Sequence, residues 1–174
     1  MKPFAYSIWL MPCAEQRAEL AALIQALSNR YATPAFAPHT TFCSGTWNLD
    51  EQDLRDAFGR LAVQTAPVEL TVRGIDWADH WAFFFFLRLA GGEAVFKRAP
   101  SRIEGAHLSS IGPHLSLLYG LGAAGIDRDA LRQELAVRLP PRIRFNSLTL
   151  VRPSTGRWED VGSWENLCSA RLGG

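Results

Sequence analysis

The sequence predicts an α+β fold of two similar lobes around a central cleft, each lobe an antiparallel-leaning sheet covered by helices. Two observations predict it. Short apolar strands alternate with amphipathic helices along the 174 residues. The order strand, helix, histidine-bearing strand, helix, strand also occurs twice, which indicates an internal duplication. We therefore expect a single bilobal domain over residues 1–174, with pseudo-repeats at about 1–80 and 81–174.

The first repeat begins with an apolar, β-prone segment followed by an amphipathic helix. Leu20, Ile24 and Leu27 recur at helical spacing within that helix, and prolines interrupt the chain after it. Either Asn48 or Asp50 caps a second helix. The expected strands are 6–10, 39–44 and 68–77, and the expected helices are 15–31 and the segment that follows residue 50.

The second repeat begins with the run Trp81-Ala-Phe-Phe-Phe-Phe-Leu-Arg-Leu. Its continuous apolar character predicts a central strand buried on both faces. The elements expected after it are a helix at 93–98, a strand at 114–119, a helix at 127–139 and a strand at 142–151, with 158–167 pairing beside the last.

Composition and charge exclude several classes of protein. Hydrophobic residues make up 48% of the chain, which excludes general disorder. The net charge of +1 argues against holding long nucleic acid by phosphate contacts alone. No apolar run approaches the ~20 residues of a membrane helix, and residues 1–7 do not resemble a secretory signal. Cys13, Cys43 and Cys168 form no C-x-x-C pair, so we expect reduced cysteines in a cytoplasmic protein and no structural zinc.

Each repeat carries one motif of the form Pro-His-x-(Thr/Ser)-apolar at a matching point. The two are Pro38-His39-Thr40-Thr41-Phe42 and Pro113-His114-Leu115-Ser116-Leu117. Because side chains alternate along a strand, His39 and Thr41 project to one side, and so do His114 and Ser116. If the lobes face each other about a pseudo-twofold axis, the two pairs converge on one cleft.

Two imidazoles across a cleft suit a reaction that needs a base and an acid at once. Free histidine titrates near ~6.5, so one ring can be neutral while the other is protonated. Hydrolysis of a cyclic phosphodiester has this requirement, because water loses a proton while the leaving ribose oxygen gains one. The two hydroxyls donate hydrogen bonds to the non-bridging oxygens as charge develops. The scheme needs no metal or other cofactor, and it leaves open which histidine is the base.

The paired motifs in a duplicated chain resemble the 2H phosphoesterase superfamily, in particular the cyclic phosphodiesterases of plant and yeast type. The segments that carry the resemblance are Tyr6-Ser-Ile-Trp-Leu-Met-Pro, Phe36-Ala-Pro-His-Thr-Thr, Pro113-His-Leu-Ser-Leu-Leu-Tyr-Gly and Trp158-Glu-Asp-Val-Gly-Ser-Trp. The resemblance implies a bilobal, metal-independent phosphoric diester hydrolase. Its substrates would be nucleoside 2′,3′-cyclic phosphates, opened to 2′-phosphates, or ADP-ribose 1″,2″-cyclic phosphate.

The resemblance also implies the site residues. His39, Thr41, His114 and Ser116 take the places of the family's catalytic set, and Tyr119, five residues after the second histidine, is carried over as a substrate-binding wall. No metal ligand is implied. Plant relatives carry disulfides that the three cysteines here do not obviously match. We expect a monomer whose partner is a small cyclic nucleotide, without membrane contact.

Two alternative functions stay open. The same chemistry could act on RNA 2′,3′-cyclic ends or 2′–5′ linkages in RNA metabolism, or the cleft could belong to a non-catalytic nucleotide-binding module. Lys97, Arg98 and Arg102 precede the second motif in an expected loop, where they either attract a second phosphate or, as we favour, form a solvated surface.

The remaining histidines and tryptophans lie outside the motifs. His80 and His107 fall in turn-like or loop segments, so we expect both at the surface. Trp9 and Trp47 are the tryptophans nearest the first motif, and we expect one or two of the six tryptophans at most to contact substrate by stacking on a base.

Overall fold

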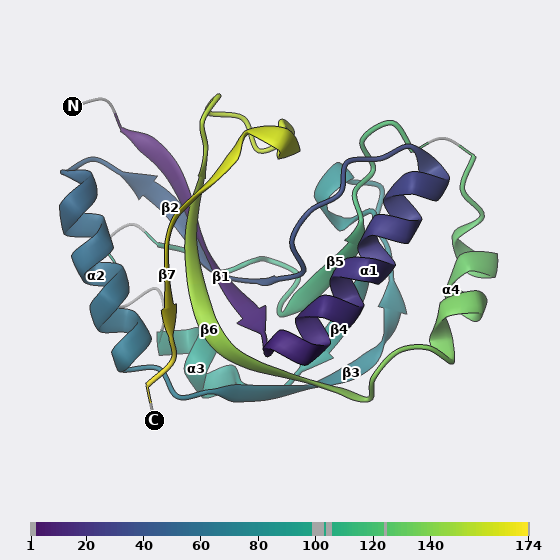
Figure 1. Ribbon diagram of the computed structural model, residues 1–174, viewed down its shortest axis with the longest axis horizontal. Helices are drawn as coiled ribbons and strands as arrows, with labels where there is room; N and C mark the ends of the chain where they lie inside the picture. The colour runs from purple at the N-terminus through teal and green to yellow at the C-terminus, as the bar shows by residue number, and fades with distance from the viewer. Residues whose placement is uncertain (1–2, 99–102, 104–105, 124, 174) are drawn as a thin grey trace.

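The structure is a computed structural model that describes residues 3–98, 103, 106–123 and 125–173, and it shows one antiparallel sheet of seven strands with four helices (Figure 1). This confirms the predicted α+β class. The elements in order are β1 (Phe4–Pro12), α1 (Ala14–Tyr31), β2 (Thr40–Trp47), α2 (Glu51–Val63), β3 (Val68–Asp76), η1 (Trp81–Phe83), β4 (Phe85–Ala90), α3 (Glu93–Arg98), β5 (His114–Leu118), α4 (Arg128–Ala136), β6 (Arg142–Pro153), η3 (Val161–Ser163) and β7 (Trp164–Arg171).

The strand order makes the duplication visible. The sheet runs β2-β1-β6-β3-β4-β5, with β7 added beside β6. In each half the first strand pairs with the histidine-bearing strand, as β1 with β2 and β4 with β5. The strand that follows the second helix of each half crosses to the other half, so that β6 pairs with β1 and β3 pairs with β4. The two crossing strands meet at the centre, where β3 pairs with β6.

Each lobe is therefore built from both halves of the sequence, a bilobal and duplicated arrangement that agrees with the predicted fold class. One lobe holds β1, β2, β6 and β7, with α2 and α3 beside it, and the other holds β3, β4 and β5, with α1 and α4 (Figure 1). The boundary between the repeats near residue 80 falls between β3 and β4. We propose that one domain spans the chain, because the sheet is continuous across both lobes.

Local sequence signals explain where the helices begin and end. The Asp50 carboxylate accepts a hydrogen bond from the Gln52 amide at 2.8 Å, which selects Asp50 over Asn48 as the cap of α2. Asp127 caps α4 in the same way, through the Ala130 amide at 3.0 Å. Helix α1 ends where Ala32 takes a left-handed conformation, with φ of 53°.

The prediction of one strand from Trp81 to Leu89 is wrong at its start. Trp81–Phe83 form a 3-10 turn, in which the His80 side chain accepts a hydrogen bond from the Ala82 amide at 3.2 Å. Strand β4 begins only at Phe85, and Arg88 within it is exposed. The expected strand at 158–167 also starts late, because β7 begins at Trp164. Apolar side chains in both segments face the cleft, so their hydrophobicity does not require a strand.

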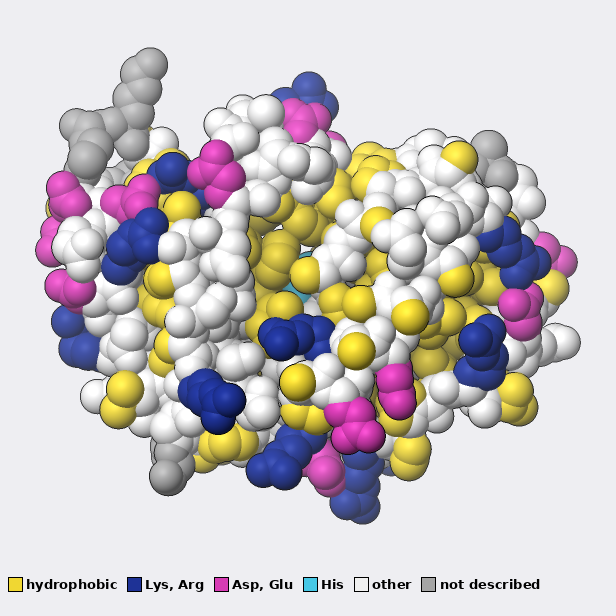
Figure 2. All heavy atoms as spheres, in the orientation of Figure 1, with side chains coloured by type: hydrophobic (Ala, Val, Ile, Leu, Met, Phe, Trp, Pro, Cys, Tyr) yellow, Lys and Arg dark blue, Asp and Glu magenta, His cyan; other side chains and the backbone are white. Residues whose placement is uncertain are grey.

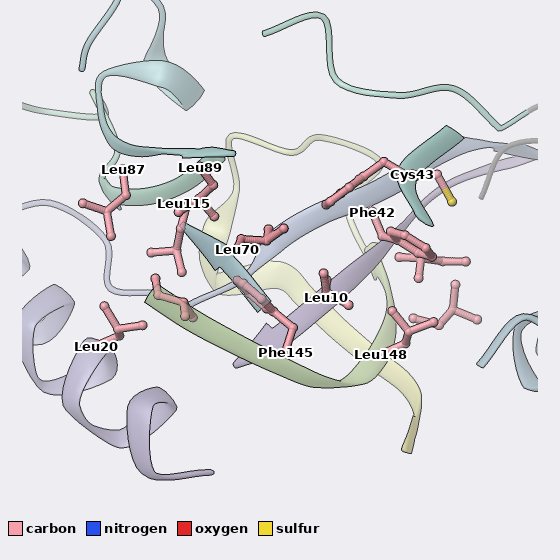
Figure 3. Packing of buried hydrophobic residues seen from close by; sticks show 14 of the residues in the cluster. Leu10, Leu20, Phe42, Cys43, Leu70, Leu87, Leu89, Leu115, Phe145 and Leu148 are labelled. Carbon is pink, nitrogen blue, oxygen red and sulfur yellow. The ribbon is translucent and has the colours of Figure 1, made fainter. Parts of the chain in front are cut away.

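The hydrophobic core extends through both lobes. A single cluster of buried side chains takes in residues from β1, β2, β3, β4, β5 and β6, among them Leu10, Phe42, Leu70, Leu115 and Phe145 (Figure 3). Burying side chains of this size, at about 1.5–3 kcal/mol each, fixes the sheet that positions the cleft. Within the described residues, no helix is long and apolar enough to cross a membrane. Cys13, Cys43 and Cys168 are free.

Candidate active site

A cavity of about 300 Å³ lies between the two lobes and contains both histidine motifs. Figure 2 shows this hollow between the lobes, with hydrophobic walls and a histidine inside it. The structure brings together all five residues that the sequence singled out, namely His39, Thr41, His114, Ser116 and Tyr119. The other described lining residues are Ser7, Trp9, Ser44, Trp81, Ala82, Phe83, His107, Leu108, Ser109, Trp158 and Trp164.

Both imidazoles are held in the same way, by a hydrogen bond to the backbone carbonyl two residues earlier. His39 Nδ1 lies 2.7 Å from the carbonyl oxygen of Ala37, and His114 Nδ1 lies 3.0 Å from that of Gly112. A carbonyl can only accept, so each Nδ1 carries the proton and each neutral ring keeps a free lone pair on Nε2. Gly112 has φ of +74°, a conformation that glycine adopts without strain. Each half therefore fixes its histidine through the residue two positions earlier.

A β-bulge follows the hydroxyl residue in the first half. On β1, Ile8 pairs with Cys43 but Trp9 pairs with Thr41, so Phe42 is an extra residue on β2. An inserted residue reverses the alternation of side chains beyond it. Ser44, five residues after the histidine, therefore lines the cavity, although strict alternation would turn it away.

The second half has the same bulge at the matching position. Phe85 pairs with Leu118 but Phe86 pairs with Ser116, so Leu117 is the extra residue on β5. The bulge brings Tyr119 to the cavity, again five residues after the histidine. Tyr119 and Ser44 thus occupy equivalent places in the two halves.

Aromatic rings surround both histidines. His39 stacks on Trp9 with ring centroids 3.8 Å apart and planes at 10°, and Trp164 meets it edge-on at 6.4 Å. His114 instead meets Phe83 and Phe86 edge-on, at 5.1 and 5.5 Å. Both histidines are 7% exposed. The two halves therefore hold their imidazoles by the same backbone hydrogen bond but pack different aromatic rings around them.

Burial determines the protonation states of His39, His114 and Tyr119 in the cavity. It lowers the pKa of His39 to about 4; the hydrogen bond to Ala37 opposes this shift, and the charge of a protonated His114 adds to it. Burial also lowers the pKa of His114, against the opposing hydrogen bond to Gly112. Both imidazoles are therefore neutral near pH 7 in the free protein. Burial raises the pKa of Tyr119, which keeps its phenol protonated.

The hydroxyls of the two motifs differ in their partners. Ser116 Oγ donates to the Ala82 carbonyl of η1 at 3.1 Å. Thr41 lines the cavity with no hydrogen-bond partner for its hydroxyl among the described residues. The Ser7 and Ser44 hydroxyls, 2.9 Å apart, form a further pair on the cavity wall. Sequence reasoning missed that pair; the signal for Ser44 was its position, equivalent to that of Tyr119.

Tyr119 contacts both lobes through its ring. Its centroid lies 3.9 Å from that of Phe36, 5.3 Å from that of Trp81 and 5.7 Å from that of Trp164. The tyrosine is 5% exposed and is thus a buried part of the wall. Its position fits the expected role as a substrate-binding wall, and that role stays a prediction.

Other sequence expectations turn out differently. Trp47 is buried against Tyr6 in the core and is absent from the cavity lining, whereas Trp81, Trp158 and Trp164 join Trp9 in that lining. Which of these tryptophans contact substrate stays a prediction, but the set that lines the cavity differs from the pair nearest the first motif. It changes because η1 and the turn before β7 fold over the cleft, which neighbours in the sequence do not reveal.

The segment around His107 also reaches the cavity. His107 is exposed, as expected, but its backbone bonds to that of Ser44 in both directions, at 2.8 and 3.0 Å. This bridge lays residues 107–109 along the cavity edge, and the buried Ser109 hydroxyl has no partner in the described structure. His80 is exposed and absent from the lining.

The predicted basic loop is described only in part. The Lys97 side chain is exposed, whereas Arg102 and the Arg98 side chain lie outside the described residues. In the described part of the chain, no three His, Cys, Asp or Glu side chains gather as a metal site would require.

Known proteins resemble this chain in sequence and in fold. No family model matches the chain. A cyclic phosphodiesterase of Arabidopsis thaliana is 27% identical over 188 residues, covering 99% of this chain and 97% of that protein. Escherichia coli LigT complexed with 3′-AMP is a structural neighbour with a TM-score of 0.58 and 16% identity, covering 98% of this chain and 99% of that one. LigT complexed with phosphate has a TM-score of 0.55 and 16% identity over the full length of both chains.

The fold is that of LigT, and the cavity of this chain pairs two histidines. Two bulged strands, one beginning directly after His39 and the other at His114, carry the hydroxyl residues and face one cavity in a fold shared with LigT. These findings support the resemblance to the 2H phosphoesterase superfamily that the two histidine motifs carry. In sequence, the chain is similar to the Arabidopsis cyclic phosphodiesterase along almost its whole length.

Proposed function

We propose that this protein hydrolyses nucleoside 2′,3′-cyclic phosphates to 2′-phosphates without a metal ion, and that ADP-ribose 1″,2″-cyclic phosphate is a second substrate of the same chemistry. The observation that carries the proposal is the pair of imidazoles whose Nδ1 atoms are both fixed by backbone carbonyls beside one cavity. The name of the Arabidopsis relative supports a cyclic phosphodiester as the substrate.

The proposed reaction moves two protons between the substrate, water and the two Nε2 atoms. One neutral imidazole accepts a proton from water as the water oxygen bonds to phosphorus. The other imidazole, protonated, gives a proton to the ribose O3′ as the phosphorus–O3′ bond breaks, which leaves a 2′-phosphate. In-line displacement places the attacking and leaving oxygens on opposite sides of phosphorus, in agreement with histidines supplied by opposite lobes.

The substrate itself would generate the acid. Both imidazoles are neutral near pH 7 because burial lowers their pKa values. An anionic phosphate placed between them favours the protonated form of the nearer ring. The Thr41 and Ser116 hydroxyls then donate to the non-bridging oxygens, where negative charge increases in the transition state.

The proposal needs one chain only, because every residue in it belongs to the same cavity. We therefore propose a monomeric enzyme. The three free cysteines suit the reducing cytoplasm, which we propose as its location.

The test is hydrolysis of 2′,3′-cyclic AMP in EDTA, with 2′-AMP and 3′-AMP separated. We expect 2′-AMP from the wild type and a loss of at least about 10²-fold in kcat for His39→Ala and for His114→Ala. His80→Asn is the matched control, because it removes an exposed imidazole outside the cavity and keeps a side-chain acceptor for the Ala82 amide. Loss of activity in EDTA would refute the metal-free chemistry.

The same assay distinguishes the two alternative functions, action on RNA and nucleotide binding without catalysis. Turnover of RNA 2′,3′-cyclic ends or of 2′–5′ linkages, with 2′,3′-cyclic AMP left intact, would move the substrate to RNA. Tight binding of nucleotide without turnover of any of these would indicate a binding module. A thermal shift with and without nucleotide measures that binding directly.

A further inference from the structure

A second cavity, of about 310 Å³, adjoins the catalytic cavity. We call it the flanking cavity. It shares Trp9 and Trp164 with the catalytic cavity, and Ala37, whose carbonyl holds His39, lines it as well. The two cavities therefore meet beside the first catalytic histidine, with two indole rings between them.

The register of the strands places both cavities on the same face of the sheet. Trp9 on β1 lies opposite Thr41 on β2 and opposite Thr149 on β6. Thr149 in turn lies opposite Ser169 on β7. Directly opposite residues share a face, so this row of four crosses the concave side of one lobe. The flanking cavity thus continues the cleft from Thr41 across β6 to β7.

The flanking cavity contains a cation. Arg17, exposed in the first turns of α1, lines it, whereas no described residue that lines the catalytic cavity is Lys, Arg, Asp or Glu. In the described structure, no carboxylate oxygen lies within 4.0 Å of the Arg17 guanidinium. The guanidinium is therefore available to an anionic ligand.

Polar groups on the sheet complete the site. The Thr149 and Ser169 hydroxyls lie 2.9 Å apart, and Asn166 Nδ2 donates to Ser169 Oγ at 3.2 Å. All three residues line the flanking cavity, and Thr149 is 7% exposed. A guanidinium next to hydroxyl and amide donors is a set that suits phosphate oxygens.

We propose that the flanking cavity binds a second phosphate of the substrate, so that the preferred substrate class is a ribonucleoside 2′,3′-cyclic phosphate that also carries a 5′-phosphate. This rests on the proposed function, because it places the cyclic phosphate between the two histidines. The uncharged aromatic wall of Trp81, Tyr119 and Trp158 then takes the base. The 5′ side of the ribose extends past Trp9 toward Arg17.

The test compares adenosine 2′,3′-cyclic phosphate with and without a 5′-phosphate. We expect kcat/KM of the wild type to be at least about fivefold higher for the 5′-phosphorylated substrate, as a charge-assisted contact at a partly exposed site allows. Arg17→Gln should bring that ratio to about one, and Arg17→Lys should restore part of it. Arg60→Gln is the matched control, because it removes an exposed helical arginine absent from the lining of both cavities and should keep the wild-type ratio.

A binding measurement keeps this inference separate from the proposed reaction. Affinities for adenosine 2′-phosphate and adenosine 2′,5′-bisphosphate are measured by titration calorimetry with wild type and Arg17→Gln. Tighter binding of the bisphosphate by wild type alone supports the flanking site, even if neither cyclic substrate is hydrolysed and the proposed reaction fails. Equal affinities, or a preference that survives in Arg17→Gln, would overturn the inference while leaving hydrolysis untouched.

Discussion

Acidic pH should destabilise this protein through His39. Burial lowers the pKa of that imidazole from 6.5 to about 4 in the folded protein, whereas an unfolded chain titrates near ~6.5. Above that value the ring is neutral in both states and adds no pH dependence. As the pH falls below it, the unfolded chain binds a proton that the folded protein does not, so the free energy of unfolding decreases. The decrease ends below the folded pKa.

The size of the effect follows from the same shift. At about 1.36 kcal/mol per pKa unit, the interval between 6.5 and about 4 corresponds to about 3 kcal/mol of unfolding free energy. Because domains are commonly stable by only about 5–15 kcal/mol, this loss is large enough to measure. His114 adds a loss of the same sign, since burial lowers its pKa as well.

Urea unfolding followed by tryptophan fluorescence, in unit steps from pH 7 to pH 4, measures the effect. His39→Gln removes the titrating ring, so the wild type should lose about 3 kcal/mol more than the variant over this range. His80→Gln, which removes an exposed histidine, should keep the wild-type pH dependence. Identical pH dependence in wild type and His39→Gln would refute the reasoning, because it would mean that the folded imidazole titrates like a free one.

Two further predictions concern the proposed catalytic groups and the backbone that supports them. Gly112→Ala places a Cβ on a residue with φ of +74°, so the free energy of unfolding, measured in urea, should fall by about 1–2 kcal/mol. The substitution should also lower kcat, because it displaces the carbonyl that holds His114. The control Gly125→Ala, at φ of +68°, should lower the free energy of unfolding and leave kcat unchanged. Thr41→Val should lower kcat about 10²-fold. Ser116→Ala should lower kcat only about tenfold, because the Ser116 hydroxyl must first give up its hydrogen bond to the Ala82 carbonyl, at a net cost of about 1 kcal/mol. A loss of kcat in Ser116→Ala that equals or exceeds the loss in Thr41→Val contradicts this reasoning.

Much of the fold was predictable because it depends on neighbours in the sequence. The spacing of Leu20, Ile24 and Leu27 predicts α1, and the two candidate caps Asn48 and Asp50 predict the start of α2 to within two residues. The Pro-His-x-(Thr/Ser) pattern predicts that His39 and Thr41 share a face, because alternation along a strand is a property of the backbone itself. The repeated motif also implied that two such strands face one cleft.

The bulges were not predictable in this way. Alternation alone turns Tyr119 and Ser44 away from their histidines, and only the extra residues Leu117 and Phe42 turn them back. Each bulge arises from the pairing between two strands that are separated by a helix and a loop, with α1 between them in the first half and α3 in the second. No residue within either motif encodes that mismatch, so Tyr119 entered the site only through the family resemblance.

The amino-acid sequence by itself determined the order of the elements and the pairing of one imidazole with one hydroxyl in each half, because these depend on side chains a few residues apart. Tertiary structure alone decided that β3 and β6 exchange lobes, that Trp81 lies in a turn over the cleft, and that Arg17 lies in a cavity beside His39. Such placements depend on burying apolar surface between segments distant along the chain, and local propensity carries no information about which distant segment will cover which face.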